Sequence, residues 1–307
     1  MQIVELQGFD YLEVSGPDSK SFLQGQLTCD VDALTATNAL PGAICNLKGR
    51  VIANFTLLQR GEDCLLQSVA GTGEKLRETL AKFAVFSKVE LKLVDPPHIS
   101  YGVLGANAGN AFAEIFPSFP DKDFETLEHN DFRVLCLPGA EQRWQIWCLT
   151  EAADTRLRQL DAMEELAPLS TWTRAEIAAG MIDVRAELSE EFTPQLLNYD
   201  ISGVINFNKG CYTGQEVVAR MYYRGKPKKR LYLLASDGSL EPAGKITTVD
   251  DSEKSIAEIL VSTEPEEGKP GLALGILPTD AAEKSLSAKS GEEGKFSVEI
   301  LPMPYTE

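Results

Sequence analysis

The spacing of hydrophobic positions changes repeatedly along the chain, and each change predicts a new strand or helix. Residues 11–16 alternate apolar and polar side chains as strands do, and residues 16–28, which contain an early proline, follow the period of a helix. Two apolar runs within residues 42–59 are interrupted at Lys48-Gly49-Arg50. This pattern predicts a β-hairpin whose turn lies at residues 48–50.

The same periodicity predicts a mixture of strands and helices through the middle of the chain. The two do not alternate regularly, so the pattern favours an α+β fold with mainly antiparallel sheets over a doubly wound parallel sheet. Strands are expected at 64–70, 88–94, 101–105 and around Val134 and Ile146, and helices at 73–86, 108–116, 151–166, 170–181 and 217–223.

The pattern changes again from Lys228 onward, where short apolar segments are separated by acidic, glycine-rich and proline-rich turns. Residues 295–300 alternate strictly, which places Phe296, Val298 and Ile300 on one face of a strand. Roughly the last 80 residues are therefore predicted to form a small all-β barrel or sandwich domain.

Length and composition are those of an ordinary soluble globular protein. The 307 residues exceed what one hydrophobic core usually serves, so two or three domains are expected. No apolar run approaches the roughly 18 residues of a membrane span, and the first residues do not resemble a secretion signal, so we expect a cytoplasmic protein. Neither G-x-G-x-x-G nor G-x-x-x-x-G-K-[ST] occurs, which removes sequence support for a dinucleotide or P-loop site.

The six cysteines lie far apart, with no C-x-x-C pair and only two histidines in the chain, so no metal site is expected. Cys64, Cys136 and Cys148 lie in apolar, strand-like runs, where a buried, reduced thiol is the ordinary outcome. Cys211 differs because it lies within the sequence KGCYTGQE, residues 209–216.

This segment has features that favour a reactive thiolate at Cys211. Thr213 and Glu216 have the spacing of a capping box, which predicts that a helix begins just after the cysteine, with its positive end near the sulfur. Lys209 would add a mobile cation, and both effects favour thiolate over thiol. The alternative is that Cys211 fills a small space beneath the helix, and the local sequence leaves both interpretations open.

Basic residues are concentrated after this cysteine, although the chain as a whole has a net charge of −17. Arg220 and Arg224 are four residues apart and share a face if the helix persists, and paired guanidinium groups suit carboxylates or phosphates. Candidate ligands are a glutamate tail, a nucleotide backbone or an acidic partner, and the alternative is a solvated helix end. The cluster consists of Lys209, Arg220, Arg224, Lys226, Lys228, Lys229 and Arg230.

The segment NFNKGCYTGQEVVARMYYRG resembles the signature of the YgfZ family of folate-binding proteins, which are relatives of the aminomethyltransferase (T-protein) of the glycine cleavage system. The stretches SGPDSKSFLQGQLTCDV, NLKGRV and KFAVFSKVEL also resemble family segments, so the resemblance covers nearly the whole chain. The matching signature positions are Lys209, Gly210, Cys211, Tyr212, Gly214, Gln215, Glu216, Arg220, Arg224 and Gly225.

The resemblance implies a three-domain, cloverleaf-like fold of the T-protein type around a central folate-binding hole. It implies tetrahydrofolate, or a one-carbon derivative of it, as the cofactor. The domains expected from it are a discontinuous folate-binding domain at 1–46 plus 183–227, a second α+β domain at 47–182 and a C-terminal β-barrel domain at 228–307.

By the same resemblance, Trp172 and Tyr11 occupy the positions of two folate-contacting tryptophans, and the turn with Lys48 and Arg50 faces the same cavity. Tyr11 departs from the family, because tyrosine keeps an aromatic face for stacking but has a smaller ring. Without the resemblance, Trp172 would be interpreted as a core residue and the turn as exposed surface. The other cofactor contacts implied are Lys209, Gln215, Glu216, Arg220 and Arg224.

The resemblance implies an accessory protein that supports tRNA modification through assembly or repair of iron–sulfur enzymes; the alternative is a folate-dependent aminomethyl or methyl transferase. Asp183, Glu187 and Asp200 are acids near the motif by position only, so no catalytic base is named. Any chemistry is expected at Cys211, by attack on a one-carbon unit, transient contact with iron, or disulfide exchange. We expect a monomer that binds folate and partner enzymes. Direct tRNA binding through the bases at 220–230 is the weaker alternative, because the net charge opposes a broad nucleic-acid surface.

Overall fold

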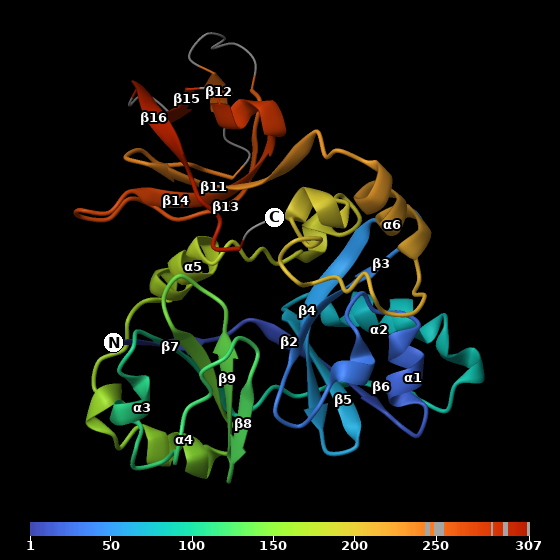
Figure 1. The fold of residues 1–307 in the computed structure, drawn as a ribbon. Helices are drawn as coiled ribbons and strands as arrows, with labels where there is room; N and C mark the ends of the chain where they lie inside the picture. Colours follow the sequence, from blue (N-terminus) through green and yellow to red (C-terminus); the bar gives the residue numbers. More distant parts are fainter. Residues whose placement is uncertain (243–245, 249–254, 284, 291–293, 306–307) are drawn as a thin grey trace.

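The structure is a computed structural model that describes residues 1–242, 246–248, 255–283, 285–290 and 294–305. Its strands form three sheets with antiparallel pairing, and helices pack at the faces and edges of these sheets (Figure 1). The predicted α+β class with mainly antiparallel sheets is therefore confirmed. No helix among the described residues is both long and apolar enough to cross a membrane.

The first sheet has the strand order β3-β4-β5-β2-β6. The hairpin predicted from the sequence is present, since β3 pairs with β4 around a turn at residues 46–50. The helices α1 (Ser19–Gln24) and α2 (Gly73–Ala81) supply apolar side chains to one core with these strands. The strands are β2 (Phe9–Ser15), β3 (Leu40–Cys45), β4 (Val51–Arg60), β5 (Asp63–Val69) and β6 (Glu90–Val94).

The helix predicted at 73–86 is too long at its C-terminal end. The α2 helix ends at Ala81, and a short 3₁₀ turn follows at Ala84–Phe86. Leu76 and Leu80 are buried against the sheet, but the side chain of Phe86 is 99% exposed. The apolar residues continue along the chain past the point where the sheet can bury them. The predicted helix is therefore longer than the observed one.

The second sheet has the strand order β1-β7-β10-β9-β8. Its first strand, β1, and its last, β8, were not predicted from the sequence. The predicted helices at 108–116 and 151–166 are also shorter, being α3 (Ala108–Ala111) and α4 (Glu151–Leu157). The strands are β1 (Gln2–Leu6), β7 (Ile99–Leu104), β8 (Thr126–His129), β9 (Phe132–Leu137) and β10 (Arg143–Cys148).

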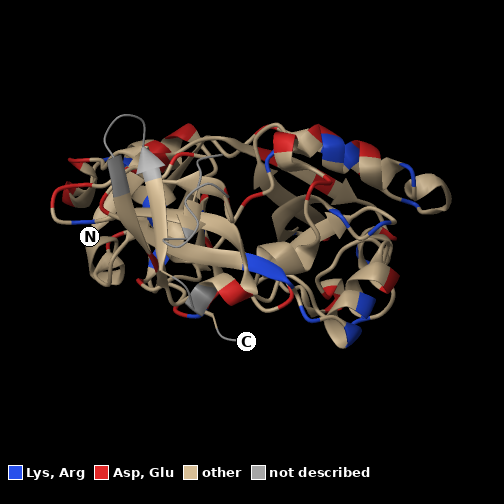
Figure 2. Cartoon of the chain, turned by 90° about the horizontal axis from the view of Figure 1, so that it is seen from above, with Lys and Arg blue, Asp and Glu red and all other residues tan. Residues whose placement is uncertain are grey.

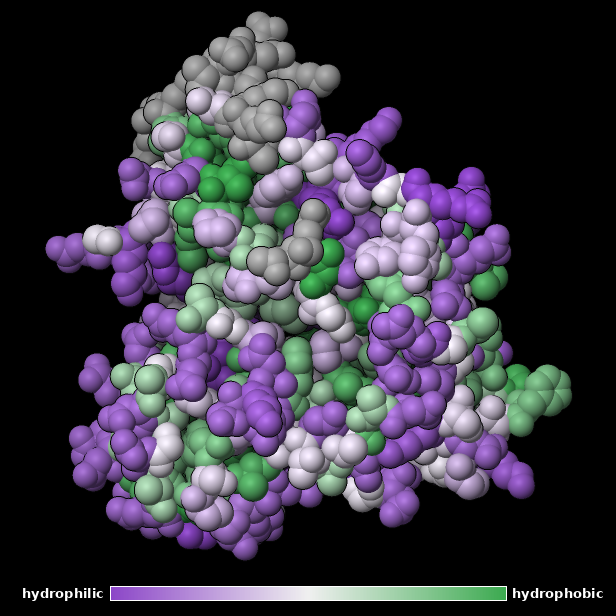
Figure 3. Space-filling model, in the orientation of Figure 1, coloured by the Kyte–Doolittle hydropathy of each residue, from purple (hydrophilic) through white to green (hydrophobic). Residues whose placement is uncertain are grey.

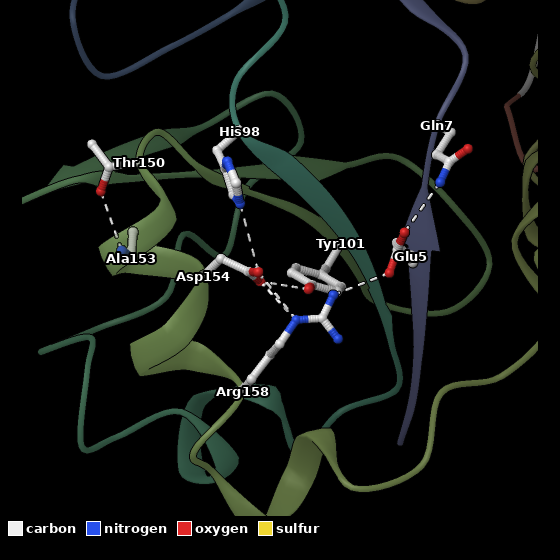
Figure 4. A network of polar contacts seen from close by, with 8 residues as sticks. All are labelled: Glu5, Gln7, His98, Tyr101, Thr150, Ala153, Asp154 and Arg158. Atoms are coloured by element: carbon white, nitrogen blue, oxygen red, sulfur yellow. Dashed lines mark hydrogen bonds and ion pairs between the residues drawn. The ribbon is translucent and has the colours of Figure 1, made fainter.

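A polar network fixes α4 to the second sheet (Figure 4). The carboxylate of Asp154 accepts a hydrogen bond of 2.6 Å from the Tyr101 hydroxyl and bonds of 3.0 and 3.1 Å from Arg158 Nε. Arg158 also donates to Glu5 of β1 over 3.1 Å. At the start of α4, the side chain of Thr150 accepts from the backbone N–H of residue 153, as an N-cap does.

The third sheet contains the described strands of the C-terminal part, in the order β12-β15-β16-β11-β14-β13. The described residues after Lys228 are mainly strands, as predicted, with one short 3₁₀ helix at Thr279–Glu283. In β16, Val298 is buried while Ser297 and Glu299 are exposed. The strands are β11 (Lys229–Ser236), β12 (Ile246–Thr248), β13 (Glu258–Ser262), β14 (Gly271–Pro278), β15 (Leu286–Ser290) and β16 (Gly294–Leu301).

One hydrophobic core joins the third sheet to the rest of the molecule. The helix α5 (Leu169–Ala178) contacts both β1 and β14, and Figure 1 shows it between the second and third sheets. Ile177 of α5 and Val218 of α6 (Gln215–Arg224) belong to the same buried cluster as Val51 of β4 and Leu274 of β14.

The sheets divide the chain differently from the segments expected by resemblance. The expected boundary between residues 46 and 47 separates β3 from β4, yet these strands pair in one sheet. The first strand, β1, belongs to the second sheet, while β2 belongs to the first. Two sheets are thus interleaved along the N-terminal half of the chain.

Candidate functional site

A cavity of about 90 Å³ lies where the first two sheets and α5 meet. Apolar rings and charged groups share its walls, which is typical of sites for small polar molecules. Its polar and aromatic lining includes Asn54 of β4, Arg143 and Gln145 of β10, Trp172 and Glu176 of α5, and Asp183.

Trp172 forms one wall of this cavity, so the structure brings the predicted residue to a candidate site. Its side chain is only 3% exposed, and its indole Nε1–H donates a hydrogen bond of 2.9 Å to Oε1 of Glu176, one helical turn later. The ring packs on Gly102 of β7, where an added Cβ would lie 2.3 Å from a ring carbon. A glycine is therefore required at this point of β7.

Glu176 is held partly in its neutral form by its surroundings. Burial, and next the negative charge of Asp183, raise the pKa of the Glu176 carboxyl to about 7. Asp183 is oriented by Asn54, whose Nδ2 donates to its Oδ1 over 2.9 Å. The cavity thus has two carboxyl groups, one of which changes its protonation near neutral pH.

Two donors on β10 face the cavity region without partners. Arg143 Nη1 and Gln145 Nε2 are buried and form no hydrogen bond with any described residue. Arg143 is fixed by its Nε, which donates to the carbonyl of Pro138 over 2.7 Å, and its guanidinium lies 5.3 Å from the Trp172 ring centroid. Buried polar groups are normally paired, so these two donors are available to a bound polar molecule.

The helix α6 begins after Cys211, as predicted, but the predicted capping box is wrong. The N-cap is Gly214, with φ of +84°, and no side chain caps the helix. The Thr213 hydroxyl instead donates to Gln26 Oε1 over 2.8 Å. Gly214 lies so close to the Asn46 carbonyl that an added Cβ would be 2.4 Å from the oxygen, so tertiary contact with the β3–β4 turn sets the helix start.

Lys209 is not the mobile cation that was expected beside the thiol. The residue is 9% exposed, and its ammonium donates to the carbonyls of Gln24 over 2.7 Å and Leu27 over 2.6 Å. These carbonyls lie at and just beyond the end of α1, where a cation satisfies otherwise unpaired acceptors. Lys209 therefore joins two segments of the core.

Cys211 is exposed, whereas the other five cysteines are buried. Burial raises the pKa of both Cys29 and Cys45 to about 12, which keeps these thiols protonated. The interpretation of Cys211 as a packed thiol beneath the helix is therefore wrong, and its sulfur is open to reagents and partners.

The turn with Lys48 and Arg50 lies against the start of α6, away from the cavity. An added Cβ at Gly49 would lie 2.9 Å from Cβ of Val217, so the turn and the helix are in close contact. Lys48 is exposed, and Arg50 donates to the carbonyl of Glu191. Of the predicted cofactor contacts, Trp172 alone lines the cavity among the described residues; Lys209, Gln215, Glu216, Arg220 and Arg224 do not.

Tyr11 lies at another place in the interface between the first two sheets. Its ring packs edge-on against Trp147 with centroids 5.6 Å apart, and burial raises the pKa of its hydroxyl. The hydroxyl accepts a hydrogen bond of 3.3 Å from Gln67, which does line the cavity. The structure thus relates Tyr11 to the cavity through Gln67, and does not place it beside Trp172.

Asp183, Glu187 and Asp200, the three acids near the Cys211 motif in the sequence, have different surroundings in the structure. Asp183 lines the cavity. Asp200 is buried in a bidentate pair with Arg230, with distances of 2.9 and 3.0 Å, and Glu187 is exposed. Glu176 was not predicted as a site residue, although its spacing of four residues from Trp172 in a predicted helix places both on one face.

Full-length relatives carry a common name. A protein of Photorhabdus laumondii named tRNA-modifying protein YgfZ is 30% identical over 310 residues, which cover 100% of this chain and 93% of that protein. A protein of the same name from Yersinia enterocolitica is 29% identical over 314 residues, covering 100% of this chain and 94% of that protein. No protein-family model matches the chain.

Among solved structures, the glycine cleavage system aminomethyltransferase T from Bartonella henselae is similar, with a TM-score of 0.80. The similarity covers 99% of this chain and 85% of that chain at 16% sequence identity. The two proteins therefore share a fold.

Proposed function

The chain belongs to the YgfZ family, and on this basis we propose that it is a folate-binding accessory protein of tRNA modification. In this proposal it assembles or repairs iron–sulfur enzymes, with tetrahydrofolate or a one-carbon derivative in the cavity beside Trp172. The sheets then correspond to a three-domain, cloverleaf-like arrangement with a C-terminal β-barrel. The relatives' name and the aminomethyltransferase fold support the proposal.

The observation that carries the proposal is the carboxyl of Glu176 in a cavity that also has unpartnered donors. The pterin ring of folate has a ring N–H and an amino group side by side, and a carboxylate accepts such a pair with its two oxygens. The pterin carbonyl needs donors, which Arg143 and Gln145 supply. The hydrogen-bond donors and acceptors of these residues therefore match those of a pterin.

The exposed position of Cys211 favours a role toward another protein. The thiol does not line the cavity, so attack on a one-carbon unit held there is the least favoured of its three expected uses. A surface thiol is accessible to iron or to a disulfide of a partner. We assign Cys211 to such a contact.

Calorimetry with tetrahydrofolate tests the cavity. The wild type should bind, and Glu176→Gln should weaken binding about tenfold or more, because hydrogen bonds to a charged group contribute about 1.5–3 kcal/mol. Trp172→Phe should also weaken it. Glu187→Gln removes an exposed carboxylate from the same region and serves as the control. Wild-type affinity in both cavity variants would show that folate binds elsewhere.

The role in tRNA modification requires a test in cells. A strain without this protein should contain less of the tRNA modifications that iron–sulfur enzymes make, and the wild-type gene should restore them. Cys211→Ser should fail to restore the modification, whereas Cys136→Ala, which alters a buried cysteine, should succeed. Full restoration by Cys211→Ser would refute the role of the thiol.

The fold and the pair of acids also favour a second function, an aminomethyl or methyl transferase. Glu176 and Asp183 provide the carboxyl groups that proton transfer would use. A methylene-transfer assay separates the two functions, since sustained turnover with folate and a donor would identify a transferase. Binding without turnover would support the accessory role.

A further inference from the structure

The exposed side of α6 and the segment after it form a cationic surface, which we call the α6 surface. The bases that form it are all exposed, and none makes an ion pair with another described residue. In Figure 2, blue marks both the α6 helix and the start of β11. The bases are Arg220, Arg224, Lys226, Lys228 and Lys229.

Aromatic rings lie among these bases. Tyr222 is 43% and Tyr223 67% exposed, which is unusual for large rings. Phe207 stacks on Tyr222 with centroids 3.8 Å apart and an interplanar angle of 13°, and Tyr223 meets Tyr222 edge-on at 5.1 Å. The two tyrosine rings are thus held by contacts with one another and with Phe207.

The helix places charge and ring side by side. Arg220, Tyr223 and Arg224 are three and four residues apart, so they share one face of α6. In the view of Figure 3, hydrophilic residues cover much of the surface, and hydrophobic ones lie around the middle and at a few places on the rim. An exposed face with both guanidinium groups and a phenol ring is suited to a ligand that is both anionic and planar.

We propose that the α6 surface binds a single-stranded segment of RNA. Phosphates match the unpaired bases, and unstacked nucleobases match the exposed rings. An acidic peptide would use the charges but leave the tyrosines in water. The net charge of −17 confines binding to this surface and so to a short strand. The choice of RNA over DNA rests on the proposed function in tRNA modification, while the surface itself is independent of the folate cavity.

The test is fluorescence anisotropy with a labelled 12-nucleotide RNA of mixed sequence, without folate. Binding should weaken with salt, with a slope of log affinity against log salt of up to about −3.5, because five bases release about 0.7 counterions each from a single strand. Arg220→Ala combined with Arg224→Ala should flatten this slope by about 1.4. Tyr223→Ala should weaken binding about fivefold or more, as loss of a base–ring stack does.

Matched controls lie elsewhere on the surface. Phe86→Ala removes a ring that is 99% exposed, and Lys92→Ala removes an exposed base, and neither should change RNA affinity. Absence of binding at 50 mM salt would overturn the proposal. Equal affinity for duplex RNA or for polyglutamate, together with no effect of Tyr223→Ala, would show a general anion or acidic-protein surface instead. Equal affinity for single-stranded DNA would overturn the assignment to RNA.

The proposals for the folate cavity and for the α6 surface can be refuted independently. RNA binding without tetrahydrofolate binding would refute the folate cavity and support the α6 surface. Tetrahydrofolate binding by Tyr223→Ala at wild-type affinity, with RNA binding lost, would support both assignments.

Discussion

Glu176 controls the proposed folate cavity because its protonation changes near neutral pH. Its pKa of about 7 arises first from burial and next from the charge of Asp183. Only the ionised carboxylate can accept the two adjacent donors of a pterin with both oxygens, Oε1 accepting in addition to its bond from the Trp172 indole. At pH below 7, binding must therefore displace a proton.

This linkage predicts that folate affinity falls as the pH is lowered. Below about pH 7, where Glu176 is protonated in the free protein, the dissociation constant for tetrahydrofolate should rise about tenfold per pH unit, since one proton is exchanged. Above pH 8 it should be constant. Calorimetry between pH 5.5 and 8.5 measures this, and Glu176→Gln should show no such dependence. A pH-independent wild type would contradict ionic recognition by Glu176.

The exposure of Cys211 predicts selective thiol chemistry. An aromatic disulfide reagent should modify one thiol in the native protein and six after unfolding, because the other five cysteines are buried. Cys211→Ser should lower the native count to zero. More than one fast thiol in the native state would show that the core opens readily.

At the scale of elements, the contact between α6 and the β3–β4 turn depends on one backbone conformation. Gly214→Ala should destabilise the protein by about 1–3 kcal/mol, because it places a Cβ against the Asn46 carbonyl at positive φ. Gly210→Ala is the matched control, since nothing lies within 4 Å of its added Cβ. Urea unfolding measures both, and equal stabilities would refute the close contact.

The polar network at α4 yields a second prediction of stability. Asp154→Ala should cost about 2–3 kcal/mol, because the buried Tyr101 hydroxyl loses its acceptor and Arg158 loses a partner. Glu5→Ala removes only the more exposed partner of Arg158 and should cost less than about 1 kcal/mol. Thermal or urea unfolding distinguishes the two, and similar losses would mean that the Tyr101 bond contributes little.

Sequence patterns correctly predicted elements that have one buried, apolar face, such as the β3–β4 hairpin and the alternating strand β16. They failed where tertiary contact decides the outcome. Gly214, rather than Thr213, begins α6 because the Asn46 carbonyl excludes a side chain there. Burial of Lys209 likewise depends on carbonyls about 180 residues away along the chain.

The candidate site was predictable only in part for the same reason. Trp172 was predicted from the family resemblance. Glu176 could have been predicted from its spacing of four residues from Trp172 in a helix. Arg143, Gln145 and Asn54 come from strands of two different sheets, so no local pattern relates them. Local sequence also could not show that Tyr11 is separated from Trp172.

At the scale of the whole molecule, the net charge of −17 opposes compactness at low ionic strength. Raising potassium chloride from about 20 to 200 mM shortens the screening length from roughly 20 Å to 7 Å and should raise the melting temperature by a few degrees. Sodium chloride should act equally, since screening depends on ionic strength. A fall in melting temperature would mean that attractive ion pairs outweigh the repulsion.

The position of β1 has a consequence for how the protein is made. Residues 2–6 leave the ribosome about 100 residues ahead of their partners in β7, residues 100–104. Synthesis at about 5–20 residues per second leaves this strand waiting for roughly 5–20 seconds. Meanwhile β2 to β6 can complete the first sheet, so β1 must stay unpaired beside a growing set of exposed strands. Its apolar residues are therefore a point at which a chaperone would engage the nascent chain.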